Sequence, residues 1–247
     1  MALYDRYSNV MSRHPPLVQR AERYRQNRLL DIVGRHLRKN HQAIRALEVG
    51  VGIGLFAQAC RERGWNYTGV DRNEKMVTML GKQFHVILAE VPPLPANIEE
   101  EIYDLAYTAF VLEHLRDGSE AFLFVNELAR AVRTQGLIVL VVPDALSLGL
   151  EFWNLDYTHR YPTAERNVTQ ILLESRLEVE EIVRYRGPCL TGPMYWVTRF
   201  AGCLYSYRLW AVLTGNKALP YSIYQYLNQD VLVFICRKPE IGSTPTS

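Results

Sequence analysis

The residues with the clearest potential for chemistry are three glycines and one acid. Gly50, Gly52 and Gly54 follow a short apolar run at residues 46–49 and precede a helical pattern. A glycine-rich turn between a strand and a helix offers backbone N–H groups and lets a ligand approach closely. Asp71 ends the next expected strand, where a carboxylate accepts hydrogen bonds from ribose hydroxyls. The arrangement predicts a nucleoside-type ligand.

The spacing of the glycines differs from that of a dinucleotide-binding site. The dinucleotide fingerprint GxGxxG requires a third glycine at position 55, where this chain has Leu55. The third glycine comes one place earlier, at Gly54, and Glu48 precedes the turn. A tight turn without any ligand is the alternative interpretation.

The elements that must hold this turn alternate along the chain. Apolar runs predict strands, and apolar residues at helical spacing predict helices. The expected strands are 46–49, 66–70, 84–88, 105–109, 137–142, 177–185 and 230–236; the expected helices are 17–37, 55–63, 74–81, one capped by Ser119 and closed by Gly136, and one from Thr163. Continuous apolar strands are typical of parallel sheets covered on both faces. We therefore expect an α/β fold with a doubly wound, mostly parallel sheet.

Several segments resemble class I S-adenosylmethionine-dependent methyltransferases. Residues 47–54, LEVGVGIG, are similar to the family's first motif, and residues 104–115, DLAYTAFVLEHL, resemble the VLEHL segment of its small-molecule members. Residues 130–143 resemble its helix, turn and fifth strand. Residues 156–161, DYTHRY, are similar to a segment of its polysaccharide and natural-product branches. The resemblance covers about residues 44–185 and the last strand, and implies a Rossmann-like sheet of seven strands.

The resemblance also implies S-adenosylmethionine as the cofactor and a role for each matching residue. Gly50, Gly52 and Gly54 would line its methionine portion, with Glu48 beneath them. Asp71 would hold the ribose hydroxyls. The remaining implied cofactor contacts are Arg72 beside the adenine, Phe110 and Val111 after the fourth strand, and Glu90 at the adenine amine. Glu90 stands where the family usually has Asp, and its longer side chain changes the reach.

On the acceptor side the sequence carries no strong catalytic signature. Methyl transfer from a sulfonium is a direct displacement that needs alignment, and an oxygen or nitrogen nucleophile also benefits from a base. His159 and His114 are the candidate catalytic residues, with a structural, hydrogen-bonded role as the alternative for each. Candidate substrate contacts are Asn154, Tyr157 and Tyr161. No set of metal ligands is predicted.

Three regions are predicted. Residues 1–43 form an N-terminal lid and helix, in which Tyr4 and Tyr7 close over the cofactor or belong to a disordered leader. Residues 44–186 and 230–240 form the cofactor-binding core. Residues 187–229 form an aromatic helical insertion, with one apolar helix at 194–213 of transmembrane-like length. Arg199 and Arg208 argue against a membrane span. The insertion is expected to cap the acceptor pocket or form a homodimer surface, with membrane-surface contact as the alternative.

Composition narrows the class of partner. The net charge of +2 is too small to argue for nucleic acid. Basic residues gather between Arg13 and Arg45, as a solvated helix face or as a flank for an anionic partner. The four cysteines form no CxxC pair and no zinc-type cluster with histidine, which predicts free thiols and a cytoplasmic protein.

The sequence therefore predicts a methyltransferase acting on a small molecule or on a glycan- or lipid-linked intermediate. One alternative keeps the cofactor but changes the reaction to ring closure or aminocarboxypropyl transfer, which releases methylthioadenosine. The other alternative is a non-catalytic scaffold that retains the fold.

Overall fold

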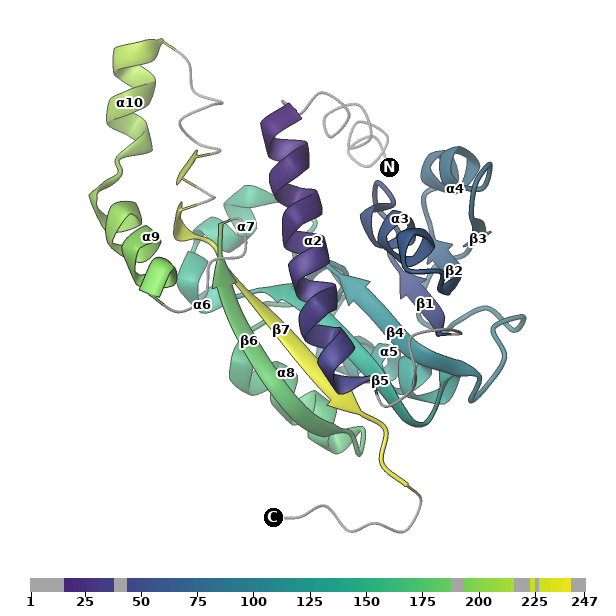
Figure 1. Cartoon of the computed structure of the whole chain (residues 1–247). Helices are drawn as coiled ribbons and strands as arrows, with labels where there is room; N and C mark the ends of the chain where they lie inside the picture. Colours follow the sequence, from purple (N-terminus) through teal and green to yellow (C-terminus); the bar gives the residue numbers. More distant parts are fainter. Residues whose placement is uncertain (1–15, 38–43, 188–192, 216–222, 225–226, 241–247) are drawn as a thin grey trace.

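The computed structural model describes residues 16–37, 44–187, 193–215, 223–224 and 227–240 (Figure 1). They build one sheet of seven strands in the order β3-β2-β1-β4-β5-β7-β6. The strands are β1 Arg45–Val49, β2 Asn66–Asp71, β3 His85–Leu88, β4 Tyr103–Ala109, β5 Val132–Pro143, β6 Glu178–Arg186 and β7 Asp230–Arg237. Strands β1 to β5 pair in parallel, and β7 runs antiparallel to both of its neighbours. The predicted doubly wound, mostly parallel sheet is confirmed.

Helices cover both faces of this sheet. They are α2 Pro16–His36, α3 Leu55–Glu62, α4 Glu74–Leu80, the 3-10 turn η1 Leu112–His114, α5 Gly118–Ala131, α6 Ala145–Leu148, α7 Glu151–Leu155, α8 Glu165–Glu174, α9 Pro193–Leu204 and α10 Tyr207–Thr214. Alternate residues of β5 separate the two cores. Val139 and Val141 pack with α2 and α3, whereas Ile138 and Leu140 pack with α5 and α8. This double burial explains why the strand reads as one continuous apolar run.

The ends of α5 differ from the prediction. Ser119 does not cap the helix; the Asp117 carboxylate does, accepting a hydrogen bond from the Glu120 N–H at 2.9 Å. The helix ends at Ala131, and Gly136 lies inside β5. A Cβ at Gly136 would stand 2.9 Å from the Arg133 carbonyl oxygen. The glycine therefore permits a close backbone approach near the register shift between β4 and β5.

The single helix predicted at 194–213 is also wrong. Ser206 has an extended backbone, and its hydroxyl accepts a hydrogen bond from the Leu209 N–H, so that the segment divides into α9 and α10. A serine favours this break because its side chain satisfies a free N–H at the start of a helix. Within the described residues, no helix combines the length and apolarity that crossing a membrane requires.

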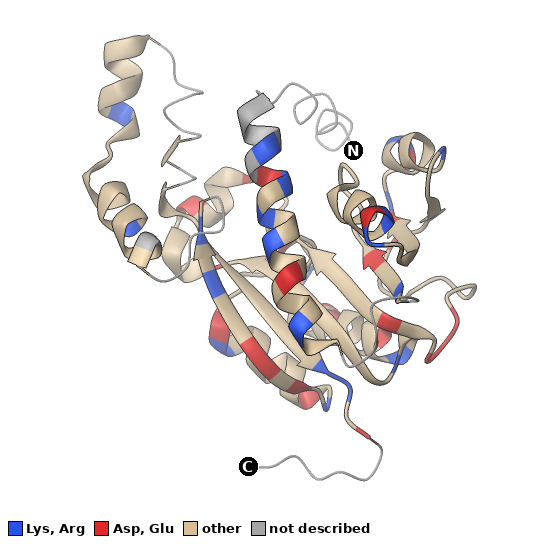
Figure 2. Ribbon diagram, in the orientation of Figure 1, with Lys and Arg blue, Asp and Glu red and all other residues tan. Residues whose placement is uncertain are grey.

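Both helices instead expose apolar side chains. Figure 2 shows α9 and α10 as largely uncharged, with one basic band on each. Their exposed apolar residues include Trp196, Val197, Phe200, Leu204, Leu209, Trp210, Val212 and Leu213. At the base of α9, the Tyr195 hydroxyl donates to the buried Asp230 carboxylate at 2.9 Å, which anchors the helix on β7. The predicted limits of the three regions stay predictions, and Tyr4 and Tyr7 lie outside the described residues.

Candidate functional site

A cavity of about 570 Å³ opens at the carboxyl ends of the central strands. Its volume falls within the range of about 300–1,000 Å³ that small-molecule sites occupy. The strand order reverses between β1 and β4, and ligands of open α/β sheets bind at such a switch point. The cavity is lined by residues from the turn after β1, the end of β2, the loop after β4, helix α2, and the loop that contains His159.

The turn after β1 is shaped by backbone conformations that favour glycine. Gly50 has a φ of +83°, and a Cβ there would lie 2.3 Å from a Val111 methyl carbon. Gly50 therefore lets the turn pack directly against the loop after β4. Gly52 has a φ of +49°, and a Cβ there would meet nothing within 4 Å. Since Gly52 lines the cavity, its bare backbone leaves space for a ligand.

Asp71 connects this turn to the end of β2. Its two carboxylate oxygens accept hydrogen bonds from the Val51 N–H at 2.9 Å and the Asn73 N–H at 2.8 Å. Burial raises the pKa of the Asp71 carboxyl, and backbone hydrogen bonds from Asn73, Val51 and Gly52 oppose the rise. A carboxylate offers about four lone-pair sites, so acceptor capacity remains beside these bonds, and the residue lines the cavity. The carboxylate is thus held in place with acceptor capacity for ribose hydroxyls.

Glu48 is a buried acid at the floor of the same turn. The Tyr67 hydroxyl donates to its carboxylate at 2.5 Å. Burial raises the pKa of Glu48 well above 4.5, the Tyr67 hydrogen bond lowers it, and the nearby Asp71 raises it further. Because Glu48 also lines the cavity, a cationic ligand group beside it would stabilise its charged form.

The other predicted cofactor contacts divide into two groups. Arg72, Phe110 and Val111 line the cavity, as do Gly50 and Gly52. Gly54 starts α3 in a left-handed conformation with a φ of +80° and does not line the cavity itself. Glu90 is exposed and is not among the lining residues, so the structure does not bring it to the site. Which cofactor atoms these residues contact stays a prediction.

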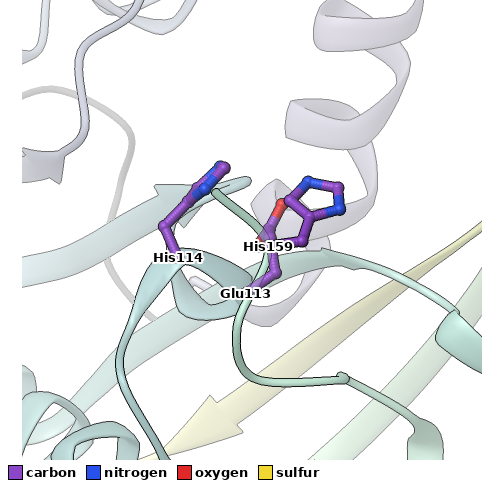
Figure 3. A group of neighbouring side chains, drawn as sticks. All are labelled: Glu113, His114 and His159. Atoms are coloured by element: carbon purple, nitrogen blue, oxygen red, sulfur yellow. The ribbon is translucent and has the colours of Figure 1, made fainter. Parts of the chain in front are cut away.

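Three neighbouring side chains, Glu113, His114 and His159, form another part of the cavity wall (Figure 3). Glu113 and His114 belong to η1, and the backbone carbonyl of Glu113 accepts hydrogen bonds from the N–H groups of Arg160 and Tyr161. These bonds bring the DYTHRY segment against η1. The two histidine rings lie 5.0 Å apart between centroids, so both candidate catalytic residues occupy one site.

Burial sets the charge of Glu113 and of His114. It raises the pKa of the Glu113 carboxyl to about 8. It also lowers the pKa of His114 to about 4, and the neighbouring His159 contributes to this lowering. Near neutral pH His114 is therefore an uncharged imidazole.

The proposed substrate residues lie around this site but not in it. Asn154 is exposed, and its side-chain amide donates to the Glu151 carboxylate at 2.9 Å. Tyr157 is 73% exposed. Tyr161 packs near the start of α5, where its ring lies 3.5 Å from the position of a Cβ at Gly118. None of the three lines the cavity, and their contacts with an acceptor stay predictions.

Helix α2 contributes a part of the cavity wall that was not predicted from the sequence. Glu22, Arg25, Gln26 and Leu29 line the cavity. Their positions follow the spacing of one helix face, which is the signal that identifies them. The Tyr107 hydroxyl donates to the Gln26 side-chain oxygen at 3.2 Å, and the Arg25 guanidinium lies 6.0 Å from the Tyr185 ring centroid. The arginines of α2 therefore differ in their surroundings. Arg25 lines the cavity, whereas Arg20, Arg23 and Arg28 are exposed.

Comparison with known proteins agrees with this geometry. Residues 21–182 match a family described as methyltransferase domain. A search of curated protein sequences gave no match.

Solved structures share the fold at low identity. A SAM-dependent methyltransferase from Archaeoglobus fulgidus is 18% identical with a TM-score of 0.58, covering 91% of this chain and 100% of that one. Phosphoethanolamine N-methyltransferase 2 of Haemonchus contortus, solved with S-adenosyl-L-methionine, is 17% identical with a TM-score of 0.58, covering 87% and 53%. The [4+2]-cyclase SpnF is 16% identical with a TM-score of 0.58, covering 86% and 80%.

Proposed function

The chain belongs to the methyltransferase-domain family of S-adenosylmethionine-dependent transferases, and from this membership we propose that it methylates a small molecule or a glycan- or lipid-linked intermediate. The observation that carries the proposal is one cavity at the sheet's switch point. The glycine turn, Asp71 and the two histidines all line it. A donor and an acceptor bound there would meet inside a single cavity.

The residues present fit the cofactor. Gly52 leaves open space where any other residue would place a Cβ, and Asp71 presents fixed acceptor oxygens beside it. Glu48 offers a buried carboxylate to the cationic methionine portion, and Arg72, Phe110 and Val111 complete the wall. S-adenosylmethionine supplies a methyl group already activated by positive sulfur. The protein's task is therefore to align the acceptor, exclude water and take up a proton.

His159 is the residue we assign to the proton. Its Nδ1 lies 2.6 Å from the Phe152 carbonyl oxygen, which can only accept, so Nδ1 carries the hydrogen. In the uncharged form of the ring, the lone pair then lies on the other nitrogen, Nε2. Because His159 lines the cavity, this nitrogen can accept a proton from an acceptor hydroxyl or amine.

The exposed apolar helices favour the lipid-linked class of acceptor. Helices α9 and α10 present aromatic and aliphatic side chains together with Arg199 and Arg208, and neither helix contains an acid. Aromatic residues with arginines are typical of surfaces that rest on anionic bilayers. No described residue of α9 or α10 lines the cavity, so the predicted cap over the acceptor stays a prediction, as does the homodimer surface.

A second candidate reaction keeps the cofactor but transfers no methyl group. It is supported by the likeness to the SpnF cyclase and by a cavity that Tyr107 and Tyr185 line. The products separate the two reactions. Methyl transfer leaves S-adenosylhomocysteine, attack on another sulfonium carbon leaves methylthioadenosine, and a cyclisation that leaves the cofactor intact gives neither.

The test is to incubate the purified protein with methyl-labelled S-adenosylmethionine and separate fractions of small metabolites, glycans and lipids. The proposal expects label in a fraction and an equal amount of S-adenosylhomocysteine. The Gly52→Val variant, whose added carbons enter the cavity, should transfer none. Methylthioadenosine without labelled product would contradict methyl transfer.

A further inference from the structure

We propose that Glu113, His114 and His159 form a binding site for a divalent transition-metal cation, with zinc as its model ion. The three side chains offer two imidazole nitrogens and one carboxylate oxygen, and these atoms all lie within 4.8 Å of one another. Figure 3 shows the side chains gathered from η1 and from the loop that follows α7. All three residues line the cavity, which leaves room for a further ligand on the cation.

The carboxylate of Glu113 is the first observation that points to a ligand. Glu113 is 1% exposed, and its Oε2 atom has no hydrogen-bond partner among the described residues. Leaving a buried polar atom unpaired costs about 1–3 kcal/mol, and more for a charged group, so native structures rarely do so. A cation bound between Glu113 and the histidines would satisfy this oxygen.

The hydrogen bonds behind the histidines are the second observation. The Thr158 hydroxyl donates to the Asp156 carboxylate at 2.7 Å, so it accepts at its contact with His114 Nδ1 at 2.9 Å. His114 Nδ1 is therefore a donor. His159 Nδ1 is also a donor, to the Phe152 carbonyl oxygen at 2.6 Å. Both rings are thereby fixed in the tautomer that carries its lone pair on Nε2.

This pattern is the one found behind metal-binding histidines. Such a histidine donates its second ring N–H to a carboxylate or a backbone carbonyl, which fixes the ring and its tautomer. Here Phe152 supplies a carbonyl directly, and Asp156 acts on His114 through Thr158. Asp156 and Thr158 are positioning residues in this arrangement.

The ligand set selects the class of cation. Imidazole suits zinc and other first-row transition ions, whereas magnesium and calcium prefer oxygen ligands alone. Around a tetrahedral zinc ion with bonds of about 2.1 Å, the ligand atoms lie about 3.4 Å from one another. The three side chains would therefore move by about 1 Å to bind the ion. Two histidines and one glutamate leave the fourth position open toward the cavity, as in catalytic zinc sites.

The chemical role of the cation rests on the proposed methyl transfer. With the cation bound, Nε2 of His159 is a ligand and no longer takes the acceptor's proton. An acceptor hydroxyl at the open position would instead lose its proton to solvent more easily, because the cation stabilises the resulting negative oxygen. That oxygen then forms the bond to the methyl carbon, and the electrons of the broken carbon–sulfur bond remain on sulfur. The site thus favours an oxygen acceptor, such as a sugar or phenol hydroxyl.

Binding can be tested without the reaction. The metal-free protein is titrated with zinc chloride in a calorimeter, and bound zinc is counted after gel filtration. We expect one zinc per chain, with affinity reduced by at least about 10- to 100-fold in His159→Ala and in Glu113→Gln, the loss that even outer-shell changes produce. The matched control is His85→Ala on β3, an exposed histidine outside the cavity, which should bind zinc like the parent protein.

The controls keep the outcome independent of the proposed function. Each variant is also titrated with S-adenosylhomocysteine and melted, so that a misfolded variant is recognised. Zinc binding lost only in the site variants, with S-adenosylhomocysteine binding retained, supports the site. Absence of zinc binding in the parent protein, or equal zinc affinity in all variants, would overturn it while leaving methyl transfer intact.

Discussion

Replacing Asp71 with Asn is the most informative single change in the cofactor region. The substitution keeps the size of the side chain and one carbonyl oxygen, but removes the negative charge and one acceptor oxygen. In the parent protein the two oxygens accept hydrogen bonds from the Val51 and Asn73 N–H groups. One of these bonds must be lost in the variant, because the new amide group is a donor.

Two effects of different size follow. A hydrogen bond to a charged group contributes about 1.5–3 kcal/mol, so losing the bonds between this carboxylate and the ribose lowers affinity by about 10- to 100-fold. The lost backbone bond costs about 1 kcal/mol of folding stability, which lowers the melting temperature of a chain of this size by about 2–4 °C. The variant should therefore remain folded while its cofactor affinity falls.

The assay is calorimetric titration with S-adenosylhomocysteine, paired with a melting curve. Asp117→Asn is the matched control, since it removes the same charge from the N-cap of α5, outside the cavity. Because Asn caps a helix as well as Asp, this variant should lose only the interaction of the charge with the helix N-terminus, about 0.3–1 kcal/mol, with unchanged affinity. Equal affinity of Asp71→Asn and the parent protein would refute the assignment of Asp71 to the ribose.

Three further predictions concern other parts of the molecule. Burial raises the pKa of Glu48 in the folded protein above 4.5, so folding favours the protonated form and stability falls as pH rises from the unfolded to the folded pKa. The Glu48→Gln variant should therefore melt at a higher temperature than the parent protein above this pH range, and at the same temperature below pH 4.5. A gain in melting temperature that does not depend on pH would contradict burial of the carboxylate as its cause. Asp230→Ala should lower the free energy of unfolding, measured in urea, by about 3–5 kcal/mol. The variant leaves the buried Arg186 guanidinium, which lies 2.5 Å from Asp230, without its charged partner. A decrease below about 1 kcal/mol would show that Arg186 finds another partner. The double variant Phe200→Glu, Trp210→Glu should sediment at least about tenfold less with vesicles containing phosphatidylserine, since two acids would replace apolar contacts on α9 and α10; unchanged sedimentation would remove membrane contact from these helices.

The parallel sheet could be predicted from the sequence because its signals are local. Runs such as Leu137 to Val142 are buried on both faces, and each expected strand corresponds to a strand of the sheet. The positions of the glycine turn and Asp71 could also be predicted, because a short strand, a turn and the next strand determine where the two lie relative to each other. Sequence spacing alone placed these residues at one end of the sheet.

What the sequence could not provide depends on contacts between distant segments. His114 and His159 meet because the Glu113 carbonyl binds the backbone of residues 160 and 161, which no periodicity reveals. The division of the 194–213 segment depends on the backbone at Ser206, where capping competes with continuation of an apolar helix. Likewise Asp117 and Ser119 are both good capping residues, and only the course of the preceding loop decides between them.

We infer that the glycine turn and Asp71 together bind S-adenosylmethionine. The most direct measurement is a crystal structure of the protein grown with S-adenosylhomocysteine. We expect density for the ligand between Gly52 and Asp71, with its ribose hydroxyls within hydrogen-bond distance of the Asp71 carboxylate. Clear density for the ligand at any other place, or a crevice without ligand at saturating concentration, would contradict it.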